Sequence, residues 1–494
     1  MAGLISTDLA DALERMNPWW SGGRGVVLPP HRRHLVAQIR RRLDQKLAPI
    51  VVVRGPRQIG KTTAQLQLIE DLLREGVRPA RILRVQFDEL ESLPNIQDPI
   101  IVIVQWFERM VLNASLNEAA HRGEPAYLFF DEVQNLPTWA PQLKSLVDNA
   151  TTQVVVTGSS ALRIELGRDS LAGRITTINA GTLSLTEIAA LRGVDLGRPF
   201  LADNGLEPLT RLDFWRALRE HGRSLAAPRD LIFRHYSERG GYPVMHQRAE
   251  VEWAPLADQL NETVIRRVIQ HDLRVGDRPG RKRDAALLEE VFRIACRHVG
   301  QTPSLKTFTD ELTTTLSANI GPQRVRQYMQ FLADTLLLRL IEPLEIRLKK
   351  KRSSFKICLT DHALRASWLH EQVPLVSEDL ASMPALSTMA GYLAESVVGA
   401  TLSTIYSLDL NYSPERKDQR ELDFVMTIGT KRIPIEVKYQ RSPDPVRDTQ
   451  GLRSFIDKAV NNAPFGLLIT QRDSDVDFGP KVLALPLSTL MLLR

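Results

Sequence analysis

A glycine-bounded loop near residue 60 has the residue types needed to hold phosphate groups. It matches the pattern G-x-x-x-x-G-K-[ST] in full, and it joins the apolar run 50–53 to a stretch that favours helix. In such a loop the backbone N–H groups and the helix N-terminus surround the phosphates, the lysine reaches the β- and γ-phosphates, and the hydroxyl ligates Mg²⁺. We therefore assign Lys61 to catalysis and Thr62 to Mg²⁺. The residues that we assign to ATP binding are Gly55, Pro56, Arg57, Gln58, Ile59, Gly60, Lys61, Thr62 and Thr63.

Two adjacent carboxylates, Asp131 and Glu132, end the apolar run 127–130. A run of this kind is typical of a buried parallel strand, whose carboxyl end would lie beside the nucleotide. We expect Asp131 to hold Mg²⁺, directly or through water, and Glu132 to polarise the water that attacks the γ-phosphate. Acidic residues that only cap a turn are the simpler alternative.

The next apolar run, 153–156, ends in hydroxyls instead of carboxylates. Thr157 or Ser159 would touch the γ-phosphate or the attacking water, and the sequence does not distinguish between them. A plain Ser/Gly turn is the alternative.

Arg174 follows in a short segment, 170–175, where a loop can project it away from its own site. In oligomeric ATPases such an arginine stabilises transition-state charge at the neighbouring subunit's γ-phosphate, so we assign Arg174 a catalytic role across a subunit boundary. An arginine in a surface ion pair is the alternative.

Strands and helices alternate around these residues. A basic helix over 31–46 precedes the first strand, and a second strand is expected over 81–88. This alternation predicts a mostly parallel sheet that is covered on both faces. Residues 1–30 contain the pair Trp19 and Trp20, and we expect them to form a short arm that docks on another element.

Composition narrows the class of protein. The 494 residues exceed one ordinary core and predict two to four domains, and 43% apolar with 25% charged residues is typical of a soluble globular chain. No apolar run approaches the ~18 residues needed to span a bilayer, and no secretory signal is recognised. Cys296 and Cys358 lie far apart without a C-x-x-C spacing, which argues against a disulfide framework or a zinc site. We expect a cytoplasmic protein, and its net charge of +6 permits a polyanionic partner.

Three helices over 287–298, 304–316 and 322–338 precede a basic segment. The last of them presents a core stripe that includes Val325 and Met329, and its other face is polar; this helix resembles the recognition helix of a winged helix-turn-helix. Residues 347–356 would then be the basic wing. The contacts would fall mainly on phosphates, with no base preference, and a helix that serves only for packing is the alternative. The residues that we assign to DNA binding are Arg324, Arg326, Gln327, Lys349, Lys350, Lys351 and Arg352.

Four residues near the C-terminus resemble the metal site of the PD-(D/E)xK nuclease fold. Glu436 and Lys438 lie on one face of a predicted strand, Asp423 comes from the preceding strand, and Glu395 lies on an upstream helix. The resemblance implies that Asp423 and Glu436 bind Mg²⁺, that Lys438 orients or activates the attacking water, and that Glu395 completes the site through water. Cleavage does not follow from the fold, and an ion pair of Lys438 with Glu436 in a DNA-docking or assembly domain is the alternative.

Together with the phosphate loop, the segments 130–134, 156–160, 171–174 and 240–243 resemble a large bacterial and archaeal family of AAA-type ATPases. The resemblance covers about residues 30–480, and the insertion-like region 191–229 departs from it. It implies an α/β chain with a parallel-sheet P-loop ATPase domain, a helical winged-helix segment and an α/β restriction-endonuclease-like C-terminal domain. The expected divisions are an arm (1–30), the ATPase domain (31–200), a helical connector or lid (201–283), the winged helix (284–360) and the nuclease-like domain (361–494).

These inferences predict an ATP-hydrolysing AAA-type motor that uses ATP and Mg²⁺ and that binds and remodels or translocates DNA. Because Arg174 would act at the site of a neighbouring subunit, we expect a homo-oligomer, such as a hexameric ring. Two alternatives stay open. One is an ATP-regulated Mg²⁺-dependent nuclease, for example in defence against foreign DNA; the other is a nucleotide-controlled switch that recruits a protein partner.

Overall fold

The chain forms two compact units. The computed structural model describes residues 5–90, 96–136, 138–158, 171–201, 205–272, 284–316, 320–345, 354–415 and 420–494. The first unit comprises residues 1–180 and the second residues 181–494. The first unit thus ends before the expected boundary at residue 200. The expected boundary between residues 360 and 361 lies inside the second unit, because strands on both sides of it belong to one sheet.

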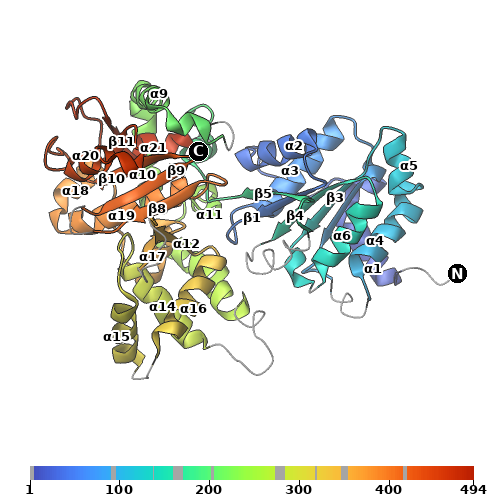
Figure 1. Ribbon diagram of the computed structural model, residues 1–494. Coiled ribbons are helices and arrows are strands. Elements are labelled where there is room, and N and C mark those ends of the chain that lie inside the picture. The colour runs from blue at the N-terminus through green and yellow to red at the C-terminus, as the bar shows by residue number, and fades with distance from the viewer. Residues whose placement is uncertain are drawn as a thin grey trace. The chain divides into compact units, whose positions relative to one another are not determined.

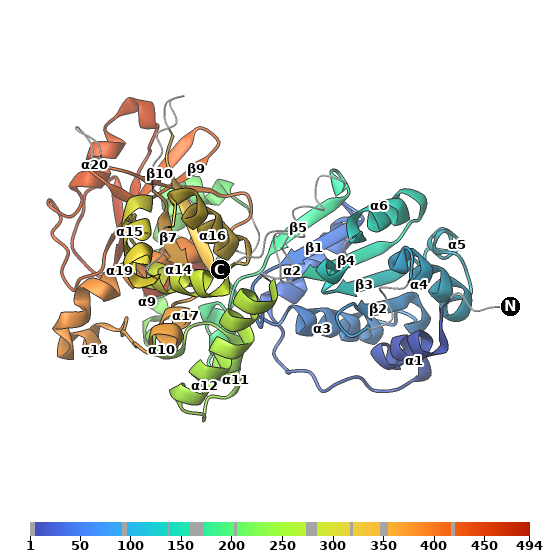
Figure 2. The ribbon, with the colours of Figure 1, turned by 90° about the horizontal axis from the view of Figure 1, so that it is seen from below.

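A five-stranded sheet forms the centre of the first unit (Figures 1 and 2). Its order is β2-β3-β4-β1-β5, and every neighbouring pair is parallel, which confirms the predicted parallel sheet. Because the strands are parallel, the residues that follow β1, β3 and β4 meet at one edge of the sheet. The strands are β1 (Ile50–Arg54), β2 (Ile82–Gln86), β3 (Tyr127–Asp131), β4 (Gln153–Gly158) and β5 (Ile175–Asn179).

Helices cover both faces of this sheet, α2 and α3 on one and α4 and α6 on the other (Figure 1). The β-strand alternation directs Val52 and Phe130 into the cluster that α4 and α6 complete, and the intervening residues face α2 and α3. The helices are α1 (Thr7–Met16), α2 (His34–Gln45), α3 (Lys61–Arg74), α4 (Pro99–Phe107), α5 (Leu116–His121) and α6 (Trp139–Asn149).

The N-terminal segment docks on the edge strand β2, as expected from its paired tryptophans. The indole N–H groups of Trp19 and Trp20 donate to the Ile82 carbonyl, at 3.2 and 2.8 Å. Asn17 exchanges two hydrogen bonds with the backbone of Arg84, at 2.7 and 2.8 Å. The arm therefore satisfies part of an edge that would otherwise expose unpaired backbone groups.

The second unit contains a seven-stranded sheet in the order β12-β11-β10-β9-β8-β6-β7. Figure 1 labels its strands β8 to β11, and Figure 2 labels β7. Antiparallel β9 and β10 form the predicted hairpin, and β6 joins β8 in parallel while it pairs with β7 in antiparallel fashion. Strands β6 and β7, from the division expected to be a winged helix, and the strands of the division expected to be nuclease-like therefore share one sheet. The strands are β6 (Leu338–Pro343), β7 (Lys356–Leu359), β8 (Asp409–Ser413), β9 (Leu422–Ile428), β10 (Lys431–Lys438), β11 (Gly466–Thr470) and β12 (Val482–Pro486).

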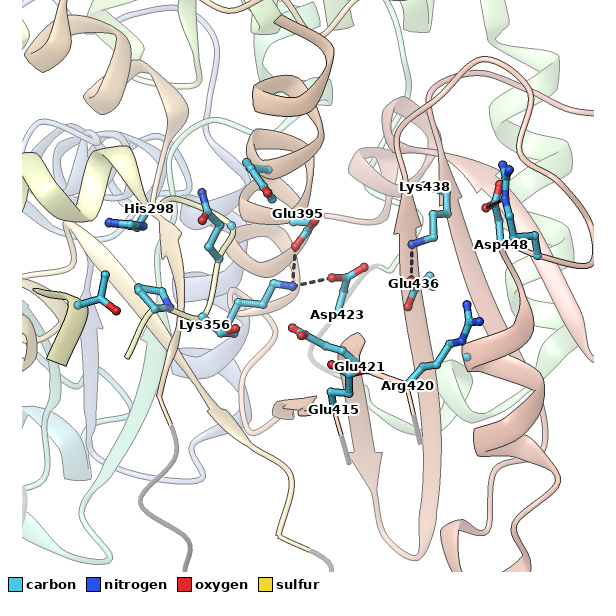
Figure 3. A pocket seen from close by; sticks show the side chains of 18 residues that line it. His298, Lys356, Glu395, Glu415, Arg420, Glu421, Asp423, Glu436, Lys438 and Asp448 are labelled. Atoms are coloured by element: carbon cyan, nitrogen blue, oxygen red, sulfur yellow. Dashed lines mark hydrogen bonds and ion pairs between the residues drawn. The ribbon is translucent and has the colours of Figure 1, made fainter. Parts of the chain in front are cut away.

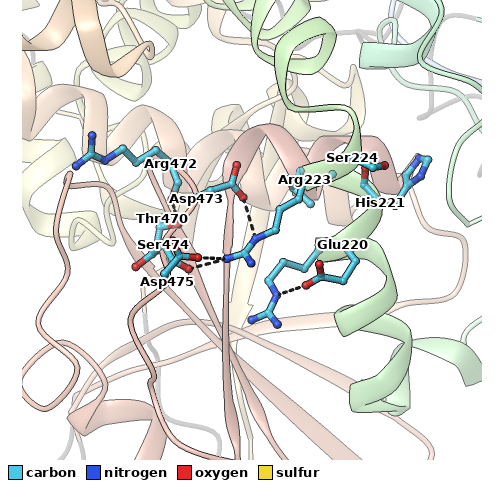
Figure 4. A network of polar contacts seen from close by, with 12 residues as sticks. Glu220, His221, Arg223, Ser224, Thr470, Arg472, Asp473, Ser474 and Asp475 are labelled. Carbon is cyan, nitrogen blue, oxygen red and sulfur yellow. Dashed lines mark hydrogen bonds and ion pairs between the residues drawn. The ribbon is translucent and has the colours of Figure 1, made fainter.

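The helical stretch after residue 205 is fastened to the C-terminal strands. Arg223 on α9 donates to the Ser474 carbonyl at 2.9 Å and pairs with Asp475 at 3.1 Å (Figure 4). Arg229 on α10 is buried and donates to Asp473 and to Thr489, each at 2.7 Å. The helices between residues 181 and 260 are α8 (Leu185–Leu191), α9 (Leu212–Ser224), α10 (Ala226–Arg239), α11 (Pro243–Gln247) and α12 (Trp253–Leu260).

The Gly240-Gly241 turn is built around a buried carboxylate. Gly240 has φ +70°, and a Cβ atom there would lie 2.1 Å from Oδ1 of Asp361. The Gly241 N–H donates to Oδ2 of Asp361 at 2.7 Å. The turn therefore requires glycine for its backbone conformation and for the close approach of Asp361.

Helices α14, α15 and α16 contact one another, and α16 packs on β6. Val325, Tyr328, Met329 and Leu332 are buried, which confirms the predicted core stripe of α16. The helix ends at Asp334 instead of the expected residue 338, because Leu336 has φ +63° and starts the turn into β6. The helices after residue 283 are α14 (Ala285–Arg297), α15 (Leu305–Leu316), α16 (Pro322–Asp334), α17 (His362–Leu369), α18 (Ser377–Ser382), α19 (Ser387–Leu402), α20 (Gln450–Ile456) and α21 (Leu487–Leu490).

Candidate functional site

The phosphate loop lies between β1 and α3 and has the geometry of an anion cradle. Gly60 adopts φ +86° immediately before α3, and a Cβ atom on Gly55 would lie 2.6 Å from the Ala180 carbonyl oxygen. The Lys61 ammonium is buried and donates to the carbonyls of Gly55 and Pro56, at 2.9 and 2.7 Å. The N-terminus of α3 and the lysine ammonium thus both lie at this loop, as phosphate binding requires.

The predicted Mg²⁺ residues meet at the adjacent strand end. The Thr62 hydroxyl donates to Oδ2 of Asp131 at 2.6 Å, and the Thr157 hydroxyl donates to Oδ1 of the same carboxylate. Asp131 is completely buried at the end of β3, and oxygen donors of this kind suit Mg²⁺. The residues therefore fit a nucleotide-bound Mg²⁺, with Thr62 and Asp131 as its protein-side donors.

Glu132 follows Asp131 in the left-handed conformation, with φ +52°. Its carboxylate accepts a hydrogen bond from the Gln134 side chain, and its backbone N–H donates to Asp131. In this turn the successive carboxylates of Asp131 and Glu132 diverge. Their two predicted roles, binding Mg²⁺ and polarising water, require separate positions. Of the two hydroxyl candidates, Thr157 contacts Asp131, and Ser159 lies outside the described residues.

Arg84 is a buried cation at this site that the sequence analysis missed. It lies on β2 with 6% exposure, and Nη2 is 3.5 Å from Oδ2 of Asp131. The same nitrogen donates to Gln86 at 2.5 Å, whereas Nε has no hydrogen-bond partner among the described residues. The sequence did contain a signal for Arg84, because a charged residue inside a predicted strand of the sheet normally has a partner of opposite charge nearby.

Arg174 lies at the amino-terminal end of β1, whereas the phosphate loop follows the carboxyl-terminal end of that strand. Its carbonyl accepts from the N–H of Ile50, the first residue of β1, whereas the loop follows the last residue of β1. Its guanidinium pairs with both carboxylate oxygens of Asp148, at 2.5 and 3.0 Å. Arg174 is therefore placed away from its own phosphate loop, and a role at a neighbouring chain's loop stays a prediction.

The four nuclease-like residues line one pocket of the second unit, and a fifth residue organises them (Figure 3). The pocket encloses about 830 Å³. Lys356, the first residue of β7, donates to Asp423 on β9 at 2.6 Å and pairs with Glu395 on α19 at 2.5 Å. Lys356 is 1% exposed, so its assignment to a solvent-facing basic wing is wrong.

The hairpin supplies a second ion pair in the same pocket. Lys438 lies 2.6 Å from Oε1 of Glu436, while Oε2 of Glu436 is buried and has no partner among the described residues. Oδ2 of Asp423 accepts from the Val437 N–H at 2.8 Å, which fastens the hairpin. The ion pair of Lys438 with Glu436 is thus present. This ion pair is the predicted alternative to a metal site.

The charges shift one another's pKa values. Burial and the Asp423 charge raise the pKa of Glu436 to about 8, and burial together with Asp423 raises the pKa of Glu395 well above its usual range. Burial opposes ionisation of Asp423, but Lys356 holds the pKa of that carboxyl below its usual value. Burial likewise disfavours the Lys356 ammonium, but Asp423 and Glu395 raise its pKa overall, so that it stays charged.

The stability of the second unit should depend on Glu436. The unfolded carboxyl loses its proton near pH 4.5, whereas the folded one keeps it to about pH 8. The unfolding free energy should therefore fall as the pH rises through this window, by an amount on the order of 5 kcal/mol. Glu436→Gln removes the titration, and urea unfolding should show a smaller loss with pH in this variant. Equal pH dependence in both proteins would contradict the assignment.

The predicted nuclease metal does not fit this arrangement. Among the described residues, no group of three or more His, Cys, Asp or Glu side chains is arranged to hold a metal ion. Glu395 and Asp423 face the Lys356 ammonium, and Glu436 faces Lys438. The resemblance predicted the ligand types and missed the lysine that lies between them.

The predicted DNA-binding face of α16 is exposed. Arg324, Arg326 and Gln327 lie on the surface opposite the core stripe. The guanidinium of Arg324 lies 5.9 Å from the Tyr328 ring and that of Arg326 lies 5.2 Å from the Phe355 ring. The remaining predicted contacts lie outside the described residues: Lys349, Lys350, Lys351 and Arg352.

Three family models match separate parts of the chain. Residues 47–189 match an AAA domain, residues 231–373 match a domain of unknown function (DUF8612), and residues 390–490 match another domain of unknown function (DUF4143). With the phosphate loop, this match defines residues 47–189 as an AAA-type P-loop ATPase domain, a class that binds nucleotides. The descriptions of the other two families name no activity.

Whole-chain relatives are distant. An uncharacterized protein of Haemophilus influenzae is 21% identical over 406 residues, covering 82% of this chain and 85% of its own length. Among solved structures, a STAND protein with a tetratricopeptide repeat sensor from Pyrococcus horikoshii (13% identity, TM-score 0.27) covers 78% of this chain, which spans 49% of that protein. Cdc6p from Pyrobaculum aerophilum (14%, TM-score 0.25) covers 72% of this chain and 97% of its own.

Domain III of the replication initiation protein DnaA from Thermotoga maritima (12%, TM-score 0.23) covers 41% of this chain and 93% of its own. The three TM-scores are too low to support an inference from these structures. Among the residues that the structure describes, no helix has the length and apolar character needed to cross a bilayer.

Proposed function

We propose that this protein hydrolyses ATP in its first unit and uses the energy to remodel or translocate DNA that its second unit binds. The observation that carries the ATPase half is the meeting of Lys61, Thr62, Asp131 and Glu132 at one edge of the parallel sheet. These residues supply the phosphate ligand, the metal donors and the base that phosphoryl transfer to water needs.

Each side chain has a distinct part in hydrolysis. Lys61 would exchange its two loop carbonyls for phosphate oxygens, and Thr62 and Asp131 would hold Mg²⁺. When bound, Mg²⁺ neutralises charge on the phosphates. Glu132 would accept a proton from the attacking water, and the Gln134 side chain orients its carboxylate.

The exposed face of α16 supports the DNA half of the proposal. Arg324 and Arg326 extend from a helix whose other face is buried, and each guanidinium is near an aromatic ring. An ordered, exposed guanidinium is suited to phosphate oxygens. Within this proposal, residues 284–360 form a winged-helix segment that contacts the DNA backbone.

The DNA half is tested by removing these two cations together. Arg324→Ala with Arg326→Ala should weaken duplex DNA binding at low salt and reduce the slope of log affinity against log salt by about 2, because two phosphate contacts are lost. Arg211→Ala with Arg216→Ala removes the same charge from exposed positions near α9 and should leave the affinity unchanged. Equal binding by wild type and the α16 variant would remove this helix from the interface. Binding of a protein instead of DNA would favour the switch alternative.

We further propose that Arg174 completes the site of a neighbouring subunit in a homo-oligomeric ring. Arg174→Ala should bind ATP and lose hydrolysis by about 10³-fold or more. Mixing it with Glu132→Gln chains should restore part of the activity, because one chain of a mixed pair supplies Glu132 and the other supplies Arg174. Asp148→Ala is the control, since it removes the arginine's partner and keeps the arginine. Failure to recover activity at every mixing ratio would return Arg174 to a surface ion pair.

A further inference from the structure

The acidic pocket of the second unit contains a cation supplied by the chain itself. The Lys356 ammonium lies within 2.6 Å of carboxylate oxygens from two separate elements, Glu395 on α19 and Asp423 on β9 (Figure 3). Lys356 is 1% exposed, and its side chain also passes 5.2 Å from the Phe424 ring centroid. A buried ammonium with two carboxylates is paired in the way that burial of charge requires.

These contacts use the oxygens that a divalent cation would need. Oδ1 of Asp423 accepts from Lys356 and Oδ2 from the Val437 N–H, and Oε2 of Glu395 faces Lys356. Of the Glu436 oxygens, Oε1 pairs with Lys438, and Oε2 has no partner among the described residues. Mg²⁺ takes near-octahedral oxygen coordination, and the Lys356 ammonium already lies against Asp423 and Glu395 where two of the predicted metal-site carboxylates meet.

We propose that Lys356 is a built-in replacement for the metal ion, so that the second unit holds its nuclease-like pocket together without a divalent cation. The ammonium balances Asp423, one of the two predicted metal ligands, and Glu395, which was predicted to complete the site through water, but it carries no coordinated water to attack a phosphodiester. The pocket still presents Lys438 and the exposed Arg420 and Arg447 to a ligand. Such a pocket suits contact with a nucleic-acid backbone without cleavage. The inference does not rest on the proposed function, because it uses only contacts inside the second unit.

The test asks whether the lysine keeps a metal out. Nucleotide-free full-length protein carrying Asp131→Asn, which removes the ATPase metal donor, is the starting chain. Its Tm should not change in millimolar Mn²⁺. Adding Lys356→Ala should lower the Tm without metal, and Mn²⁺ should then raise it by about 5 °C, because two carboxylates become available. Adding Lys438→Ala removes the same charge from the same pocket and should give no Mn²⁺ response, since Lys356 still holds Asp423 and Glu395.

A direct measurement keeps the proposal testable if Lys356→Ala does not fold. Electron paramagnetic resonance should find no stoichiometric Mn²⁺ bound to the starting chain. One Mn²⁺ per chain that disappears on Asp423→Asn would overturn the proposal. A folded Lys356→Ala chain whose Tm ignores Mn²⁺ would also overturn it, because the lysine would then not occupy a metal position.

Discussion

Lys61→Ala is expected to reduce ATP turnover by about 10²–10³-fold, the usual loss when a charge-stabilising donor is removed from a reacting phosphate or oxyanion. Lys61 is the buried cation at the N-terminus of α3, and it donates to two loop carbonyls in the structure. Alanine leaves those carbonyls without their donor and the loop without its positive charge. The loss should appear in phosphate release measured at saturating ATP.

Lys144→Ala is the matched control for this variant. Lys144 is an exposed lysine of α6 in the same unit, so its loss changes the net charge equally and should leave turnover unchanged. If folded Lys61→Ala protein hydrolysed ATP at the wild-type rate, the phosphate loop would not be the site of hydrolysis.

Lys356→Met is expected to reduce the free energy of unfolding of the second unit by about 3–5 kcal/mol, because it leaves two buried carboxylates without their cation. Methionine preserves most of the side-chain volume, so the loss would report charge more than packing. Urea unfolding followed by the fluorescence of a tryptophan in this unit, such as Trp368, measures it.

Lys438→Met provides the comparison within the same pocket. Its side chain is 36% exposed and its partner Glu436 can take up a proton, so the expected loss is only about 1 kcal/mol. Equal losses for the two variants would mean that Lys356 has no special place in the pocket.

Local patterns predicted which residues of the first unit meet, because these residues follow strand ends. The phosphate loop, Asp131 and Thr157 each come directly after an apolar run, and parallel strands bring such positions to one edge. The same reasoning predicted the buried stripe of α16, since helical periodicity decides which face is covered.

Long-range contacts account for what the sequence did not reveal. Lys356 follows a run of basic residues, and nothing local distinguishes it from them; its partners are 39 and 67 residues away, and only the shared sheet and α19 bring them together. The partner of the Gly240-Gly241 turn, Asp361, is 120 residues away. Arg84 was missed for a different reason: the sequence predicts its strand, but local patterns do not reveal that β3 lies beside β2 and brings Asp131 within 3.5 Å of its guanidinium.

The most direct test of the account is the rate of ATP hydrolysis by wild-type protein at low salt, measured alone and with single-stranded, duplex and junction DNA. We expect hydrolysis that at least one DNA form increases severalfold, with both the basal and the stimulated rate lost in Glu132→Gln. Hydrolysis that no form of DNA alters, in protein that binds none of them, would contradict the claim that ATP energy acts on DNA.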